Sequence, residues 1–181
     1  MKRSFIAAAL AGVALVSFEA GAQIAPKPVQ IGVAAGAAIP MSDLSDLANT
    51  GYNGTLTIGF SPALIPLGIR IDGAYNQFGV KNAFGGGNVH IAAVTGNFVY
   101  KIPGATVSPY AIGGAGWYNT SLGNNAFFGS ASDNHFGWNI GGGISMPLSG
   151  FDTFLEARYN QVQISNSPSL KFVPITFGLM F

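Results

Sequence analysis

Bulky apolar residues occupy every second position at the end of the chain. They are Val173, Ile175, Phe177, Leu179 and Phe181, and the residues between them are Pro174, Thr176, Gly178 and Met180. Successive side chains of a β-strand point to opposite faces of the sheet. The alternation therefore predicts a strand with one bulky face in an apolar medium and one face of mostly small or weakly polar residues.

The same alternation recurs in seven segments upstream. The positions predicted to share the outward, apolar face are Val29, Ile31, Val33, Ala35, Ala37 and Ile39; Tyr52, Leu56, Ile58 and Phe60; Leu67, Ile69, Ile71 and Tyr75; Val94, Phe98 and Tyr100; Tyr110, Ile112 and Tyr118; Trp138, Ile140, Ile144 and Met146; and Leu155, Ala157 and Tyr159. Residues 89–100 are compatible with either phase, and the polar Thr95 and Asn97 are placed inward. Eight strands result, and no helical periodicity follows residue 22.

Connections between these segments alternate in length. Short turns are predicted at 61–66, 102–107 and 147–152, and long loops at 41–49, 79–87, 120–135 and 163–169. Nine of the ten prolines lie outside the predicted strand interiors or at their ends, because proline lacks the N–H that a sheet needs. Pro174 is the exception, and it predicts a bulge or a locally unpaired donor.

Composition explains what surrounds the sheet. Charged residues make up only 8% of the chain and hydrophobic residues 49%, whereas about a quarter of the residues of soluble domains are charged. After residue 22 no stretch is long and apolar enough for a transmembrane helix. The chain is thus apolar and nearly uncharged and yet lacks a membrane-spanning helix. Strands that carry apolar residues on one face account for both properties, so we expect an all-β fold, an eight-stranded antiparallel transmembrane β-barrel. Tyr110 and Tyr118 are assigned to its aromatic girdles.

The N-terminus has the features of an export signal. Lys2 and Arg3 precede an apolar run from 5 to 16, and small residues at 20–22 form a cleavage site. This pattern predicts a secretory signal peptide over 1–22 and a mature barrel domain over 23–181. The apolar run is shorter than the roughly 20 residues that a membrane-spanning helix needs.

The mature chain is formally neutral. The first 22 residues contain Lys2, Arg3 and Glu19, so six basic and six acidic residues remain. No basic surface is left for nucleic acid. The absence of cysteine excludes disulfides, thiolate metal sites and cysteine nucleophiles. No cofactor and no metal site are expected.

Four segments resemble a known family. They are SPYAIGGAGWYN at 108–119, FGWNIGGGISMPL at 136–148, LEARY at 155–159 and VPITFGLMF at 173–181. They are similar to the OmpA-type small outer-membrane β-barrel domains, and the likeness covers the whole mature chain. The resemblance implies a place in the outer membrane of a Gram-negative bacterium, in contact with its lipid. It also implies that the terminal Phe181 is read by the barrel assembly machinery.

Four charged residues are predicted to meet inside the barrel. Arg70 and Asp72 on the third strand, and Glu156 and Arg158 on the seventh, all fall on inward positions. These strands face each other across an eight-stranded barrel, which predicts Arg70 level with Glu156 and Asp72 level with Arg158. An uncompensated charge in a narrow lumen costs several kcal/mol, so pairing is expected. The pairs either plug and stiffen the lumen or form a gate or ion path.

Other candidate chemistry is weaker. Residues 129–135 place Ser130, Ser132, Asp133 and His135 in one outer loop, but residues this close in sequence seldom form a serine–histidine–acid site. His90 is isolated from His135, which excludes a two-histidine metal site. Phe127 and Phe128 are unusual in a loop and are assigned to the barrel rim, to lipopolysaccharide or to a partner.

Three functions remain open for a barrel of this kind. The first is a non-enzymatic structural or surface-interaction protein with a mostly plugged lumen. The second is a narrow, porin-like channel for small solutes or ions, and the third is an outer-membrane lipid enzyme that depends on Ser130, Ser132 and His135. A soluble ligand-binding barrel is the alternative fold, and the shared face of charged and small residues disfavours it.

Overall fold

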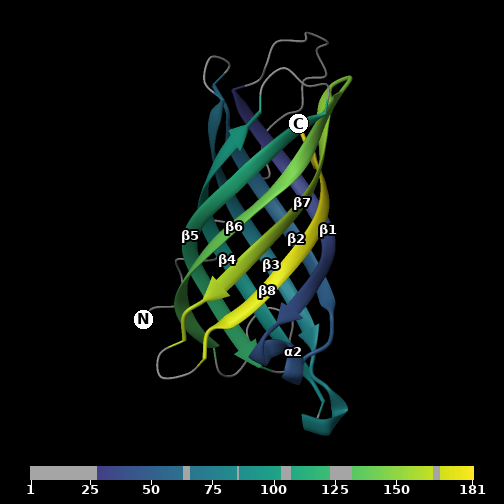
Figure 1. Ribbon diagram of the computed structural model, residues 1–181, viewed down its shortest axis with the longest axis vertical. Helices are drawn as coiled ribbons and strands as arrows, with labels where there is room; N and C mark the ends of the chain where they lie inside the picture. The colour runs from purple at the N-terminus through teal and green to yellow at the C-terminus, as the bar shows by residue number, and fades with distance from the viewer. Residues whose placement is uncertain (1–27, 63–65, 85, 103–106, 123–131, 165–167) are drawn as a thin grey trace, which may run out of the picture.

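The computed structural model describes residues 28–62, 66–84, 86–102, 107–122, 132–164 and 168–181 as a closed barrel (Figure 1). Its strands are β1 (Val29–Met41), β2 (Gly51–Phe60), β3 (Leu67–Gly79), β4 (Asn88–Lys101), β5 (Ser108–Leu122), β6 (Ser132–Leu148), β7 (Phe151–Val162) and β8 (Leu170–Met180). Each strand pairs antiparallel with the next, and β1 pairs with β8 to close the sheet. The eight-stranded antiparallel barrel is confirmed.

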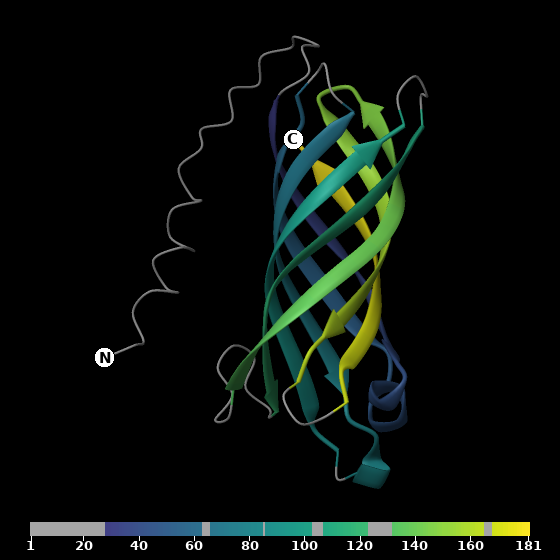
Figure 2. The same ribbon diagram turned by 60° about the vertical axis from the view of Figure 1, so that its left-hand side comes forward.

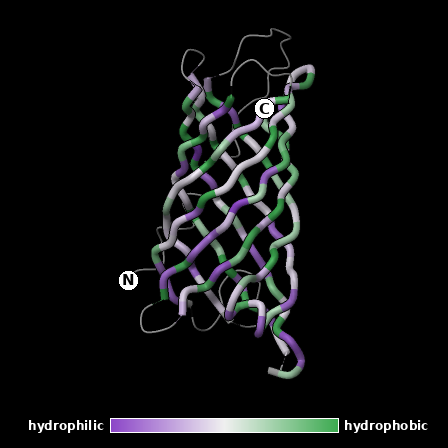
Figure 3. The backbone as a smooth tube through the Cα atoms, viewed as in Figure 1, coloured by the Kyte–Doolittle hydropathy of each residue, from purple (hydrophilic) through white to green (hydrophobic). Residues whose placement is uncertain are grey.

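Bulky apolar side chains cover the outside of the barrel. The strongly exposed ones include Val33, Leu56, Phe60, Ile71, Val94, Phe98, Trp117, Ile140, Leu155 and Phe177. Figure 3 shows hydrophobic and hydrophilic residues alternating along the strands, as a sheet with an apolar outer face requires. The phase chosen for residues 89–100 is confirmed, because Thr95 and Asn97 are buried while Phe98 is 61% exposed.

The predicted phase of the fifth strand is wrong. Tyr110, Ile112 and Tyr118 are buried inside the barrel, and Trp117, at 69% exposed, faces outward. Tyr110 and Tyr118 are therefore not girdle residues. Glycines on β6 leave room for both rings, since a Cβ at Gly143 would lie 2.6 Å from Tyr110 and one at Gly137 would lie 2.7 Å from Tyr118. Inside, each hydroxyl also finds an acceptor.

The connections divide the barrel into a short-turn end and a long-loop end. At the short-turn end β6 and β7 are joined by residues 149–150 alone, and Gly150 has a φ of 99°, which favours glycine. At the long-loop end lie the helix α2 (Asp43–Leu47) and the 3-10 turn η2 (Asn82–Phe84). Figure 2 shows α2 at the end opposite the C-terminus. No helix was predicted there, because five residues are too few to show a period.

Two details of the sheet differ from the sequence pattern. Strands β5 and β6 extend to Leu122 and from Ser132, so part of the predicted 120–135 loop is strand. At Pro174 the β7–β8 ladder skips two pairs, and its register is the same on both sides of the gap. Proline there interrupts the ladder without inserting a residue, so the predicted bulge is absent from the β7–β8 ladder, and the interruption falls where proline has no N–H to donate.

Among the residues described, no helix is long and apolar enough to cross a membrane.

Candidate functional site

The structure brings Arg70, Asp72, Glu156 and Arg158 together inside the barrel. Arg70 Nη2 donates to Glu156 Oε1 and Oε2 at 2.9 and 2.8 Å, and Arg158 Nη1 donates to Asp72 Oδ2 at 2.8 Å. These are the cross-lumen contacts between β3 and β7. Two further pairs lie within single strands, where Arg70 Nε is 3.0 Å from Asp72 Oδ1 and Arg158 Nε donates to Glu156 Oε1 at 3.0 Å. The four residues form one ring of alternating charge, which we call the charged network.

Neutral donors complete the coordination of the two carboxylates. Thr57 Oγ1 donates to Asp72 Oδ1 at 2.7 Å, and Asn97 Nδ2 donates to Asp72 Oδ2 at 2.9 Å. Tyr110 Oη donates to Glu156 Oε2 at 2.8 Å. Asp72 is 1% exposed and Glu156 3%. Desolvating a carboxylate this strongly is costly, and the surrounding donors offset that cost.

Aromatic and amide side chains extend the charged network. The guanidinium carbon of Arg70 lies 5.6 Å from the centre of the Phe154 ring, a cation–π contact. Asn139 Nδ2 donates to Asn97 Oδ1 at 2.9 Å, which continues the hydrogen-bond chain from Asp72 to β6. Among the described side chains, Asn139 Oδ1 is a buried oxygen without a hydrogen-bond partner. Asp72 fixes which atom donates at each step of this chain. Its carboxylate accepts from the Asn97 amide N–H, so the Asn97 carbonyl oxygen is left to accept from Asn139.

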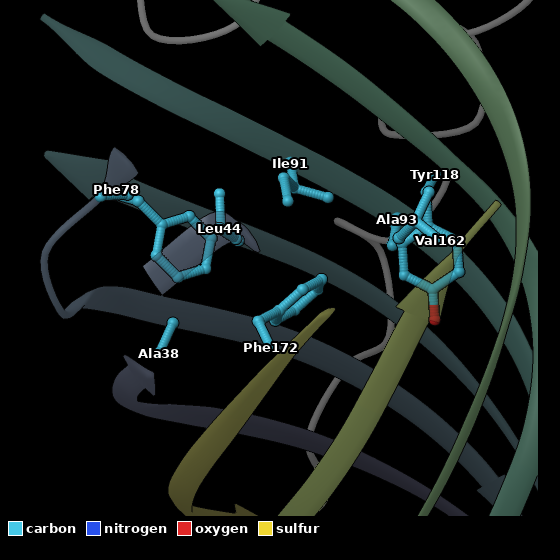
Figure 4. Packing of buried hydrophobic residues seen from close by; sticks show 9 residues of the cluster. Ala38, Leu44, Phe78, Ile91, Ala93, Tyr118, Val162 and Phe172 are labelled. Atoms are coloured by element: carbon cyan, nitrogen blue, oxygen red, sulfur yellow. The ribbon is translucent and has the colours of Figure 1, made fainter. Parts of the chain in front are cut away.

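Apolar layers lie on both sides of the charged network. The layer toward the long-loop end, which we call the outer apolar layer, consists of Ala38, Leu44, Ala48, Phe78, Ile91, Ala93, Tyr118, Val162 and Phe172. Figure 4 shows Leu44 reaching from α2 toward Phe78. The layer toward the short-turn end, the inner apolar layer, consists of Val99, Tyr110, Ile112 and Phe154. The charged network is thus enclosed between two apolar layers.

Two small cavities remain in the lumen, each of about 30 Å³. The outer cavity is bordered by three asparagines and by three members of the charged network: Asn53, Asn76, Asn160, Arg70, Glu156 and Arg158. The inner cavity is bordered by Ser61, Lys101 and Tyr110. Arg70 and Phe154 border both cavities. Each has room for a few water molecules at most.

The weaker sequence candidates do not form a site among the described residues. Ser130, Phe127 and Phe128 lie outside the described residues. Asp133 is exposed and His135 half-buried on β6. His90 lies on β4 and is buried. Its Nδ1 is 2.6 Å from Tyr75 Oη. Within the described part of the chain, no group of three or more histidine, aspartate or glutamate side chains is placed to hold a metal ion.

Phe181 takes part in closing the barrel. Its backbone N–H donates to Ile31 O at 2.8 Å, and the Ile31 N–H donates back to Phe181 O at 3.1 Å. Its ring lies 5.9 Å from that of Phe151. The terminal residue therefore continues the β1–β8 ladder.

Sequence reasoning missed Tyr110 and Leu44. For Tyr110 the sequence gives no signal, because glycine or alanine stands on both faces of β5 between the two tyrosines. Leu44 lies in a short polar loop, where no pattern marks it as buried.

Comparison with known proteins places the fold. A family model described as outer membrane protein beta-barrel domain matches residues 8–181. The structure is similar to Neisserial surface protein A (NspA), with a TM-score of 0.67 and 15% identity over 85% of this chain and 96% of that chain. It is also similar to the outer membrane enzyme PagL, with a TM-score of 0.50 and 16% identity over 84% and 98% of the two chains.

A further similar structure is the N-terminal β-barrel domain of Pseudomonas aeruginosa OprF, with a TM-score of 0.48 and 16% identity over 84% of this chain and 97% of that domain. Among curated protein sequences, none matches this chain at a significant level. At identities this low, the likeness to NspA and PagL shows the fold alone.

Proposed function

Because this chain belongs to the outer membrane protein β-barrel domain family, and its place is therefore the outer membrane, we propose that it is a non-enzymatic structural or surface-interaction protein with a plugged lumen. Long loops of such barrels face the outside of the cell and short turns face the periplasm. The end that carries α2 is accordingly the surface that meets partners, and outer-membrane lipid surrounds the apolar outer face.

One observation carries the proposal of a plugged lumen. The charged network spans the barrel from β3 to β7, and its two positive and two negative groups neutralise one another. A solute crossing this point must separate ion pairs whose members are at most 8% exposed. Removing one partner from a buried pair costs about 3–5 kcal/mol. The side chains therefore oppose passage strongly.

A narrow channel for small solutes or ions is the second candidate. It is favoured by the polar inward side chains and by the two cavities, both of which Arg70 borders. In this alternative, the Arg70–Glu156 pair opens to join the cavities. Catalysis is not part of either candidate, although PagL shows that the same fold also supports an enzyme.

Conductance across a planar bilayer distinguishes the two candidates. The mature chain is refolded in detergent, inserted and recorded as wild type. We expect no unitary steps. Discrete ohmic steps from the wild type would contradict the plugged lumen and support the channel.

An independent signal must show that a silent sample is inserted. Trp117 is 69% exposed on the outer face of the barrel. In vesicles of the same lipid with brominated acyl chains, its fluorescence should be quenched. Trp117→Phe, in which only Trp138 remains in the chain, identifies the part of the quenching that belongs to Trp117.

A further inference from the structure

The short helix α2 is tied to the neighbouring long loop. Lys81 Nζ donates to Ser45 O at 2.8 Å, and the Lys81 N–H donates to Leu47 O at 2.9 Å. Asn49 N–H donates to Gly79 O at 2.8 Å, on the other side of an isolated bridge between Ala48 and Val80. These few hydrogen bonds hold α2 at the long-loop end.

The two leucines of α2 have opposite environments. Leu44 is 2% exposed and belongs to the outer apolar layer, whereas Leu47 is 43% exposed. One side chain of the helix thus fills part of the mouth of the barrel, among residues contributed by β1, β3, β4 and β8 (Figure 4). Leu44 is the member of this layer that comes from a helix anchored at the rim, while Phe78, Ile91 and Phe172 belong to strands of the barrel.

The outer cavity lies directly beneath this layer. It is lined by polar groups, including Asn53, Asn76 and the charged network except Asp72, and also by Ala74 and Phe172. An apolar constriction excludes water and ions even when no charge blocks it. The first barrier that a solute meets from the long-loop end is therefore apolar, and the charged network is a second barrier behind it.

A strained backbone residue lies beside α2. Ser42, which precedes the helix, has a φ of 51° and is a non-glycine residue in the left-handed region. Non-glycine residues seldom adopt this conformation, and it stores strain that a change of backbone can release. Ala48, which follows the helix, is already extended.

We propose that α2 is a lid that closes the outer end of the lumen with Leu44, and that its displacement exposes the outer cavity to water and to small reagents from the long-loop end. The inference rests on the proposed plugged lumen and adds to it a closure that acts independently of the charged network.

Reaction of a single cysteine tests the lid, since the natural chain has none. Ala74→Cys places the thiol at the border of the outer cavity. The mature protein is refolded in detergent and treated with a small, charged methanethiosulfonate. Labelling should be slow in this parent and at least about tenfold faster after Leu44→Ala, because removing a buried leucine opens a cavity in the layer. Leu47→Ala, on the same helix, should leave the rate unchanged.

A second variant loosens the lid without changing the apolar layer. Lys81→Met removes the hydrogen bond to Ser45 O and should raise the labelling rate by a smaller factor. Circular dichroism shows whether each variant is folded. Complete labelling in urea shows that its thiol can react with the reagent. If Leu44→Ala does not fold, the comparison between Lys81→Met and Leu47→Ala decides.

Two outcomes overturn the lid. The first is a parent whose thiol reacts as fast as an exposed control cysteine at Asn49. The second is equal labelling in the Leu44, Lys81 and Leu47 variants. If either result is found and the wild type is silent in the bilayer, the lid is contradicted and the plugged lumen is not. Unitary steps from the wild type would instead contradict the plugged lumen itself.

Discussion

Glu156 accepts hydrogen bonds from three side chains, Arg70, Arg158 and Tyr110. The change Glu156→Gln keeps the size of the side chain but leaves two guanidinium groups facing one carboxylate. An unbalanced buried charge costs about 3–5 kcal/mol, and we expect the free energy of unfolding to fall by that order. Urea titration of the refolded protein in lipid vesicles, followed by fluorescence and gel mobility, measures the loss.

The paired variant separates charge balance from hydrogen bonding. Arg70→Met combined with Glu156→Gln restores neutrality, because Asp72 and Arg158 still face each other at 2.8 Å. The double variant should be more stable than Glu156→Gln alone, since a buried pair replaced by neutral groups is often tolerated. Strictly additive losses would contradict a network held together by charge compensation.

At the scale of the element, period-two alternation predicted eight strands and the outward face of seven. It failed on β5 for a physical reason. Tyrosine has an apolar ring and a polar hydroxyl, so it suits the lipid interface and the lumen equally well. The residues between the tyrosines are mostly glycine and alanine, which mark no face. Only the pairing with β6, which places glycine beside each ring, settles the phase.

Close packing between β5 and β6 is therefore testable at Gly143. A methyl group there would meet the Tyr110 ring and the Leu155 carbonyl oxygen. Gly143→Ala should lower the free energy of unfolding by about 1–3 kcal/mol, the usual cost of overpacking. Gly96→Ala is the matched control, because no atom lies within 4 Å of its added Cβ. Equal unfolding curves for the two variants would mean that Tyr110 does not occupy this position.

The period-two alternation also made part of the candidate site predictable. Alternation and an even strand count placed Arg70 and Glu156 on facing strands, and buried charges require partners. The pairs within each strand were not predictable, because residues two apart on one face reach each other only when the side chains bend toward a shared partner. Leu44 was beyond reach as well, since its burial depends on how a five-residue helix folds back over the rim.

Across the whole molecule, closure depends on the seam between β1 and β8. Phe181 adds a final pair of hydrogen bonds to this seam, with Ile31, and a ring contact with Phe151. Deleting Phe181 removes these contacts at one edge of the barrel and leaves the pairing from Gly32 to Met41 intact. The refolded barrel should therefore lose only about 1–2 kcal/mol of stability.

Assembly in cells should respond to the same deletion far more strongly, if the terminal aromatic is the signal read by the assembly machinery. We expect the folded, heat-modifiable fraction in outer-membrane preparations to fall by about tenfold or more, a change larger than the stability loss alone predicts. Phe181→Tyr retains an aromatic ring at the end of the chain and should restore assembly. Parallel losses in cells and in refolded samples would instead mean that Phe181 acts only through the seam, because a defect of stability must appear wherever the barrel folds.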